Sequence, residues 1–181
     1  GLVYAERFGQ GAYITKATAQ LMRDLGSIQS PQNAFYLHVG LETLSLRMER
    51  HCANAKAIAR WLAAREEVAW VSYPDLEEDP DHELAEKYLP QGSCGVVSFG
   101  LKGGRERAIA FMDSLELVSI ATHVADARTC LLHPASHTHR QLSDQQLREG
   151  GIAPDLIRLS VGIEDVRDIL EDLEKALGKA L

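Results

Sequence analysis

The stretch CGVVSFGLKGGRERAIAFMDSLELVSI, residues 94–120, decides the fold class of this chain. Its opening residues are rich in strand-forming side chains and predict a strand, which Gly103-Gly104 interrupts. Residues 105–115 then repeat apolar side chains at helical spacing, and residues 117–122 predict another strand. A strand, a helix and a strand in such close succession indicate a sheet interspersed with single helices.

The flanking sequence adds elements of the same kind. Ser30-Pro31 starts a long helical region, since serine caps a helix and proline suits its first turn. Several strands are connected too closely for parallel crossovers, so we expect a mainly antiparallel sheet with helices on one face, in an α+β fold. The further strands are predicted at residues 68–73, 129–132 and 156–161, and the helices at 12–25, 30–65 (one helix or a pair), 82–88 and 164–181.

The composition is that of an ordinary globular protein, and it argues against two classes of partner. Of the 181 residues, 45% are hydrophobic and 25% are charged, and the formal net charge is −7. No cluster of Lys and Arg offers the basic face that nucleic acid requires. No apolar run reaches the roughly 20 residues of a membrane helix, and the first residues lack the layout of a signal peptide. We therefore expect a soluble, cytoplasmic protein.

A charged residue in the predicted strand LIRLSVG, residues 156–162, is the first candidate for a site. Arg158 cannot lose its charge, so in a strand that otherwise looks buried its guanidinium needs a partner. The planar fork fits a carboxylate better than any other group. Two interpretations stay open from the residues alone: Arg158 binds the carboxylate of a ligand, or it forms an ion pair with an internal acid or lies at an edge facing solvent.

The segment HPASHTHRQLS, residues 133–143, is the second candidate. The spacing of His133, His137 and His139 resembles a set of metal ligands, but Pro134 disrupts a helical pair and the segment holds no acid or cysteine. We therefore expect a hydrogen-bonded loop and no metal. The three cysteines are widely spaced and odd in number, which predicts neither a disulfide framework nor a metal site, and a reducing compartment fits best.

The third candidate is the segment ATHVADAR, residues 121–128. His123 and Asp126 could form an orienting pair, although a lone histidine at a strand end is more often structural. A Ser-His-Asp hydrolase is a weak alternative, because no serine sits in a G-x-S-x-G elbow. Among the six lysines, Lys16 lies on a predicted amphipathic helix, where a solvated position is the simpler interpretation. No glycine-rich phosphate loop occurs, since Gly103-Gly104 lacks the required pattern.

Three longer segments together resemble one enzyme family. They are SP followed by GLETLSLRMERHCANA (residues 30–31 and 40–55), ATHVADARTCLLHPASHTHRQLS (residues 121–143) and DLIRLSVGIEDVRDIL (residues 155–170). In order and spacing they resemble the Cys/Met-metabolism family of pyridoxal-phosphate (PLP) enzymes, and within it the O-acetylhomoserine sulfhydrylases. The opening GLVYAERFGQGAYITKA resembles the segment that follows the catalytic region in these sulfhydrylases.

The resemblance implies a fold-type I PLP enzyme, of which residues 1–45 form the end of the large cofactor-binding domain with the linking helix and residues 46–181 form the small C-terminal domain. It also implies that the Schiff-base lysine and the other cofactor-binding residues lie upstream of Gly1. We therefore expect no catalytic, cofactor-binding or metal-binding residue in this chain. On this view the chain is an inactive fragment of a homo-oligomeric transferase.

The resemblance further assigns substrate-binding roles. The residue matching Arg158 holds the α-carboxylate of the amino-acid substrate in the family. His123 stands where relatives carry serine or asparagine beside that carboxylate, and Thr138 matches a threonine close to the substrate, whereas His137 replaces another threonine. The expected activity of the complete enzyme is γ-replacement, which makes homocysteine or methionine from O-acetylhomoserine and sulfide or a thiol. The alternatives are cystathionine γ-synthase or methionine γ-lyase chemistry, or a non-catalytic binding domain.

Overall fold

The computed structural model describes residues 1–180, which divide into two compact units, residues 1–43 and residues from Leu44 onward. The first unit is entirely helical, and the second holds the sheet and the hydrophobic core. In chain order the elements are α1 (Tyr4–Phe8), η1 (Gly9–Gly11), α2 (Ala12–Lys16), η2 (Ala17–Met22), α3 (Arg23–Leu25), α4 (Pro31–Glu42), α5 (Leu44–Ala63), β1 (Val68–Ser72), α6 (His82–Tyr88), β2 (Val96–Leu101), α7 (Gly104–Asp113), β3 (Ser119–Ile120), β4 (Cys130–Leu132), α8 (Asp144–Glu149), β5 (Leu156–Ser160) and α9 (Val166–Lys179).

The first unit contains the two helical regions that the sequence predicts, from residue 12 and from residue 30, but α1 and η1 precede them where no helix was predicted. The predicted helix 12–25 consists of α2, the π-helical η2 and α3 in succession, and it ends at Gly26, whose φ of 65° is left-handed. The Ser30 hydroxyl caps α4 by accepting a hydrogen bond from the Asn33 amide at 3.2 Å, with Pro31 in the first turn. The predicted helical region 30–65 is a pair of helices, α4 and α5. No side chain of residues 1–43 is buried.

The sheet has five strands in the order β1-β2-β5-β4-β3. The pairs β1–β2, β2–β5 and β5–β4 are antiparallel, which confirms the predicted sheet, and β3 and β4 form a short parallel pair that the sequence did not indicate. Strand β3 is much shorter than the predicted strand 117–122, because only two of its residues pair with β4.

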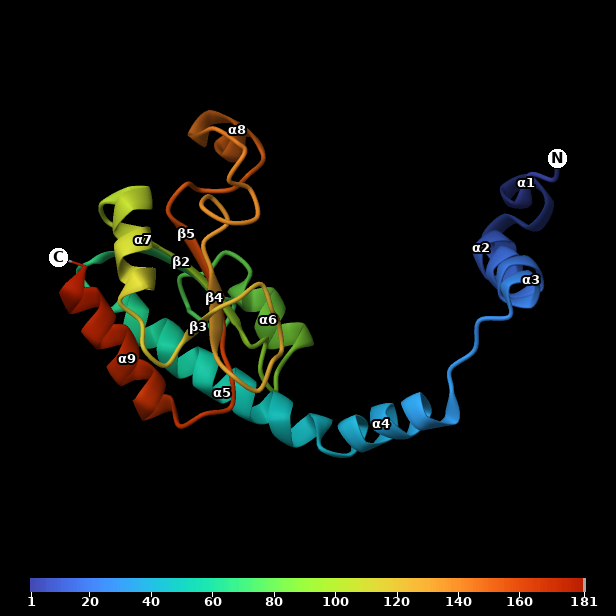
Figure 1. Cartoon of the computed structure of the whole chain (residues 1–181), viewed down its shortest axis with the longest axis horizontal. Helices are drawn as coiled ribbons and strands as arrows, with labels where there is room; N and C mark the ends of the chain where they lie inside the picture. Colours follow the sequence, from blue (N-terminus) through green and yellow to red (C-terminus); the bar gives the residue numbers. More distant parts are fainter. Residues whose placement is uncertain (181) are drawn as a thin grey trace. The chain divides into compact units, whose positions relative to one another are not determined.

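Helices α5, α7 and α9 cover one face of this sheet (Figure 1). Alternate residues of β2 and β5 point into the core between the sheet and these helices, where Phe99 and Leu159 are fully buried. Helix α9 adds a stripe of buried apolar side chains that includes Ile169 and Leu173. The N-cap of α9 is Asp165, and its predicted end, Leu181, lies outside the described residues.

Helix α8 was not expected. It starts at a capping box in which the Ser143 hydroxyl accepts from the Gln146 amide, while the Gln146 side chain accepts from the Ser143 amide. A serine followed three residues later by glutamine is a recognisable helix start, so the sequence held the signal. The Arg105 guanidinium bonds Asp144 and, at 2.8 Å, the Ala135 carbonyl, and it thereby links α7 to the segment around α8. Among residues 1–180, no helix is long and apolar enough to cross a membrane.

Candidate functional site

The strand β5 presents Arg158 on the sheet face opposite the helices. Its neighbours in the strand, Ile157 and Leu159, are fully buried against the helical layer, and strand alternation turns Arg158 to the other side. In the register of the sheet, Arg158 lies between Ser98 of β2 and Leu132 of β4. The charged side chain is therefore mounted at the centre of a five-stranded sheet, where the backbone that carries it is held from both sides.

The Arg158 guanidinium has few internal partners. Its Nη2 donates to the Thr122 carbonyl at 3.0 Å, whereas its Nε is buried and has no hydrogen-bond partner within the described residues. No ion pair joins Arg158 to an acid in the part of the chain that the structure describes. Of the two interpretations of this arginine, the internal ion pair is thus absent among residues 1–180. The fork retains unused N–H groups of the kind that bind a carboxylate.

The segment that follows β5 is anchored by α5. The buried ring of His51 places Nδ1 2.6 Å from the Val161 carbonyl, and because a carbonyl only accepts, Nδ1 carries the proton. The Asn54 amide donates to the carbonyls of Gly162 and Glu164 at 3.1 and 2.9 Å. These contacts fix the end of the strand that holds Arg158.

The loop between β3 and β4 lies over the same strand. His123 is exposed, and its carbonyl accepts a hydrogen bond from the Cys130 thiol at 3.3 Å. The orienting pair of His123 with Asp126 is not formed, because Asp126 instead pairs with Arg128 at 3.2 Å. Hydrogen bonds from the Arg128 side chain and backbone hold the pKa of Asp126 at about 2.

The histidine segment after β4 is a hydrogen-bonded loop. The buried His133 ring donates from Nε2 to the Pro154 carbonyl at 2.8 Å, so its Nδ1 is free to accept from the Ser136 hydroxyl at 2.9 Å. Burial lowers the pKa of His133, which favours the neutral ring. His137 also contacts Ser136. Among residues 1–180, no group of three side chains could hold a metal ion.

Thr138 is exposed, and its hydroxyl contacts the Nδ1 of its neighbour His139 at 2.9 Å. Within the described residues, no hydrogen bond joins the Thr138 side chain to Arg158 or to the 121–129 loop. The structure therefore brings the His123 segment onto Arg158, through the carbonyl of the preceding Thr122, but it does not connect Thr138 to that pair.

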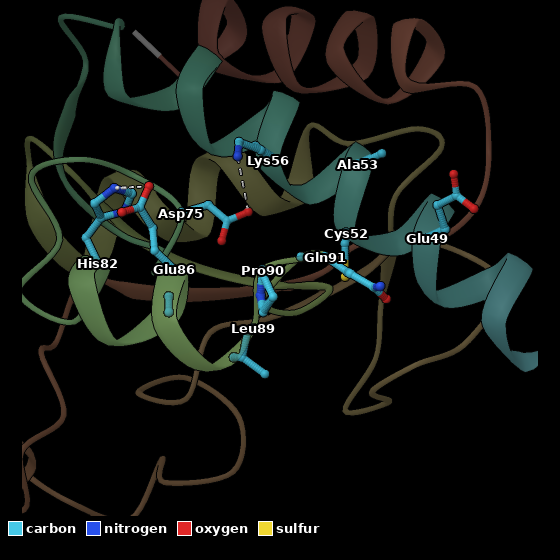
Figure 2. A pocket seen from close by; sticks show the side chains of 12 residues that line it. Glu49, Cys52, Ala53, Lys56, Asp75, His82, Glu86, Leu89, Pro90 and Gln91 are labelled. Carbon is cyan, nitrogen blue, oxygen red and sulfur yellow. Dashed lines mark ion pairs between the residues drawn. The ribbon is translucent and has the colours of Figure 1, made fainter.

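A separate hollow of about 400 Å³ lies between α5 and α6 (Figure 2). Two contacts join side chains that line it, Lys56 with Asp75 at 3.5 Å and His82 with Glu86 at 3.6 Å. None of Arg158, His123 and Thr138 lines it. The hollow is therefore distinct from the face of the sheet that carries Arg158.

Comparison with known proteins agrees with this architecture. The model of the family described as Cys/Met metabolism PLP-dependent enzyme matches residues 3–178. The chain is 45% identical to O-acetyl-L-homoserine sulfhydrylase 1 of Thermus thermophilus and 46% identical to homocysteine synthase of Schizosaccharomyces pombe, covering 98% of this chain and 42% and 41% of the two relatives. The chain thus spans about two-fifths of the length of these curated relatives.

Solved structures show the same fold. A protein from Campylobacter jejuni described as an O-acetylhomoserine (thiol)-lyase superposes with a TM-score of 0.82 at 35% identity, over 95% of this chain and 41% of that one, and it contains N'-pyridoxyl-lysine-5'-monophosphate. The O-acetylhomoserine sulfhydrylase of Wolinella succinogenes superposes with a TM-score of 0.78 at 33% identity, over 96% of this chain and 46% of that one. By sequence and by fold, the chain belongs to the Cys/Met-metabolism family of PLP-dependent enzymes.

Proposed function

We propose that this chain is the C-terminal part of a γ-replacement transferase, which makes homocysteine or methionine from O-acetylhomoserine and sulfide or a thiol. The curated relatives that it matches are named for that chemistry, and it covers about two-fifths of their length. In this proposal residues 1–45 end the large domain and residues 46–181 form the small domain. The complete enzyme is a homo-oligomer in the cytoplasm.

The observation that carries the proposal is the unsatisfied guanidinium of Arg158. The buried Nε of Arg158 has no partner within the described residues. The one hydrogen bond of the guanidinium there runs from Nη2 to the neutral Thr122 carbonyl. Leaving a buried donor of a charged group unpaired costs roughly 1 to 3 kcal/mol. The Nη groups retain N–H donors that the Thr122 carbonyl does not use, and the α-carboxylate of an amino acid would accept parallel hydrogen bonds from them.

His123 and Thr138 are proposed as secondary contacts to the substrate. His123 is exposed and follows directly on Thr122, whose carbonyl accepts a hydrogen bond from Arg158. This position in the chain supports a role for His123 as a hydrogen-bond donor to a carboxylate bound there. Thr138 is exposed in the middle of the loop that leads to α8, and its hydroxyl contacts only His139 among the described residues. We assign Thr138 the weaker contribution of the two.

The cofactor of the family is PLP, and we propose that this chain does not supply the residues that hold it. Lys56 is paired with Asp75, and α7 begins at the left-handed Gly103 without a capping side chain or a glycine-rich phosphate loop. We therefore place the lysine that binds the cofactor in the part of the relatives' length that this chain does not cover. The contribution of this chain is to bind and orient the amino acid.

This assignment predicts that the 181 residues alone are inactive and do not hold the cofactor on a specific lysine. The test is to add one equivalent of PLP, reduce with borohydride and map modified peptides by mass spectrometry, with the Thermus thermophilus relative as the positive control. Stoichiometric modification of a single lysine in this chain would contradict the assignment.

The reaction is tested on the complete reading frame from which these residues derive, or on a chimera in which residues 3–178 replace the matching segment of the Thermus enzyme. Purified protein is assayed with O-acetylhomoserine and sulfide, with cystathionine, and with methionine. The proposal expects the sulfhydrylase reaction to have the highest kcat/KM. Faster cleavage of methionine or formation of cystathionine would reassign the reaction, and absence of all three activities would favour a binding domain.

A further inference from the structure

We propose that Ser160 is a positioning residue for the substrate carboxylate, because it holds the loop that orients the Arg158 guanidinium. The inference rests on the proposed function of Arg158 and deepens it. Ser160 lies two residues after Arg158 in β5 and therefore on the same face of the strand, and its side chain is buried, at 2% exposure.

The loop between β3 and β4 adopts a conformation that needs support. Ala125 has a φ of 61°, the one left-handed non-glycine residue among residues 1–180. An alanine rarely adopts this region, because its Cβ crowds the backbone there. The amide N–H of Ala125 donates to the Ser160 hydroxyl at 3.1 Å, so this hydroxyl holds the loop at its strained residue.

Both ends of the loop are fixed independently of Ser160. At the far end, Glu164 accepts hydrogen bonds from the Thr129 amide and hydroxyl at 2.6 and 2.8 Å, and the Ala127 carbonyl accepts from the Ile163 amide at 2.9 Å. At the near end, the Ala121 amide donates to the Leu131 carbonyl at 3.0 Å. Between these ends the loop has two further contacts: the Ser160 hydroxyl holds the strained Ala125, and the Cys130 thiol, a weak donor, bonds the His123 carbonyl at 3.3 Å. The Ser160 hydrogen bond is the stronger of the two and the one that acts at the strained residue.

The link to the site is the Thr122 carbonyl, which receives the only hydrogen bond that the Arg158 fork makes within the described residues. When the Ser160 hydroxyl is removed, Ala125 can relax to a negative φ, and the carbonyl three residues earlier moves with it. The Arg158 guanidinium then loses the acceptor that sets its orientation, and the Arg158 side chain occupies several rotamers. Binding weakens because the fork must be ordered again for each substrate.

The test measures kcat and KM for O-acetylhomoserine in the complete enzyme or the chimera, for Ser160→Ala and for Ser114→Ala. The control loses one hydroxyl-to-backbone bond, from Ser114 to the Ala110 carbonyl at 2.8 Å, at the end of α7. We expect Ser160→Ala to raise KM about fivefold, the effect of one ordinary hydrogen bond, with kcat within about twofold. The control should leave both constants unchanged.

A second variant separates positioning from general destabilisation. In Ser160→Ala combined with Ala125→Gly, glycine adopts the φ of 61° without the hydroxyl, so we expect KM to return to within about twofold of the unmodified enzyme. An unchanged KM in Ser160→Ala, or failure of the glycine to restore it, would overturn the inference. Arg158→Lys is measured in parallel: if it also leaves KM unchanged, the proposed function of Arg158 fails, and if it raises KM while Ser160→Ala does not, only this inference fails.

Discussion

Replacement of Asp172 by asparagine should lower the free energy of unfolding of this chain far more than a substitution on a charged surface helix usually does. Asp172 lies on α9 but is only 6% exposed. Its Oδ1 accepts from the Glu116 amide at 2.9 Å, and its Oδ2 accepts from the amides of Leu117 and Val118 at 3.0 and 2.9 Å. One carboxylate therefore satisfies three backbone donors of the segment that enters β3.

The cost of Asp172→Asn follows from these three bonds. In its best orientation the asparagine side chain keeps its oxygen at the position of Oδ2, where it accepts from the backbone amides of Leu117 and Val118. Its NH₂ group then faces the backbone amide of Glu116, which is also a donor. One hydrogen bond to a charged group is lost, worth about 1.5 to 3 kcal/mol, and the two that remain become neutral and weaker. The free energy of unfolding should therefore fall by about 2 to 4 kcal/mol.

The assay is urea unfolding of the 181-residue chain, followed by circular dichroism, with Glu174→Gln as the matched control. Glu174 lies on the same helix, and its carboxylate is 62% exposed and pairs with Arg65 at 3.0 Å, so loss of this charge should change stability by about 0.5 kcal/mol or less. If Asp172→Asn cost no more than this control, the structural role given to Asp172 would be refuted.

Substitutions at three further positions test separate parts of the structure. Gly100→Ala should cost about 2 to 4 kcal/mol in urea unfolding, since its Cβ would lie 2.2 Å from both Trp70 Nε1 and Asp155 Oδ2 and would break their 3.0 Å hydrogen bond; a cost below about 0.5 kcal/mol would contradict this. At Ala125, valine should be at least about 1 kcal/mol less stable than glycine in the same assay, because a β-branched residue is strained at a φ of 61°, and equal stability would show that the loop is not strained. Because burial lowers the pKa of His133, the unfolded chain binds more protons at this residue than the folded chain. The free energy of unfolding should therefore be highest above pH about 6.5 and should fall as the pH drops below that value. This decrease should be smaller in His133→Gln, and equal pH profiles of the two proteins would argue against a neutral buried ring.

Much of the fold could be predicted because helix signals and apolar periodicity are local. Ser30-Pro31 and the acidic start of α9 mark helix ends in the sequence itself, and the alternation of β2 and β5 marks their buried faces. The parallel pairing of β3 with β4 was not predictable in this way. Its register depends on which strands meet in space, and β3 is too short to show a pattern of its own.

The candidate site was predictable only in part, for a related reason. An arginine inside an apolar strand signals a need for a partner, but its partner, the Thr122 carbonyl, is 36 residues away and is a backbone group. Ser160 and Glu164 were not singled out, because a serine and a glutamate near a strand end have no sequence signature for binding a distant loop. Asp126 was expected to orient His123, but Arg128, two residues along the chain, competes for it with two donors and a positive charge.

The proposed role of Arg158 is tested most directly by a double-mutant cycle on the complete enzyme or the chimera. Inhibition or binding constants are measured for O-acetylhomoserine and for 3-aminopropyl acetate, which lacks the α-carboxylate, with the unmodified enzyme and with Arg158→Ala, and Arg60→Ala serves as an exposed control on α5. We predict that removing the carboxylate weakens binding to the unmodified enzyme by roughly 100-fold but hardly changes binding to Arg158→Ala, a coupling of about 2 to 3 kcal/mol. An equal loss in both enzymes would show that the carboxylate is bound elsewhere.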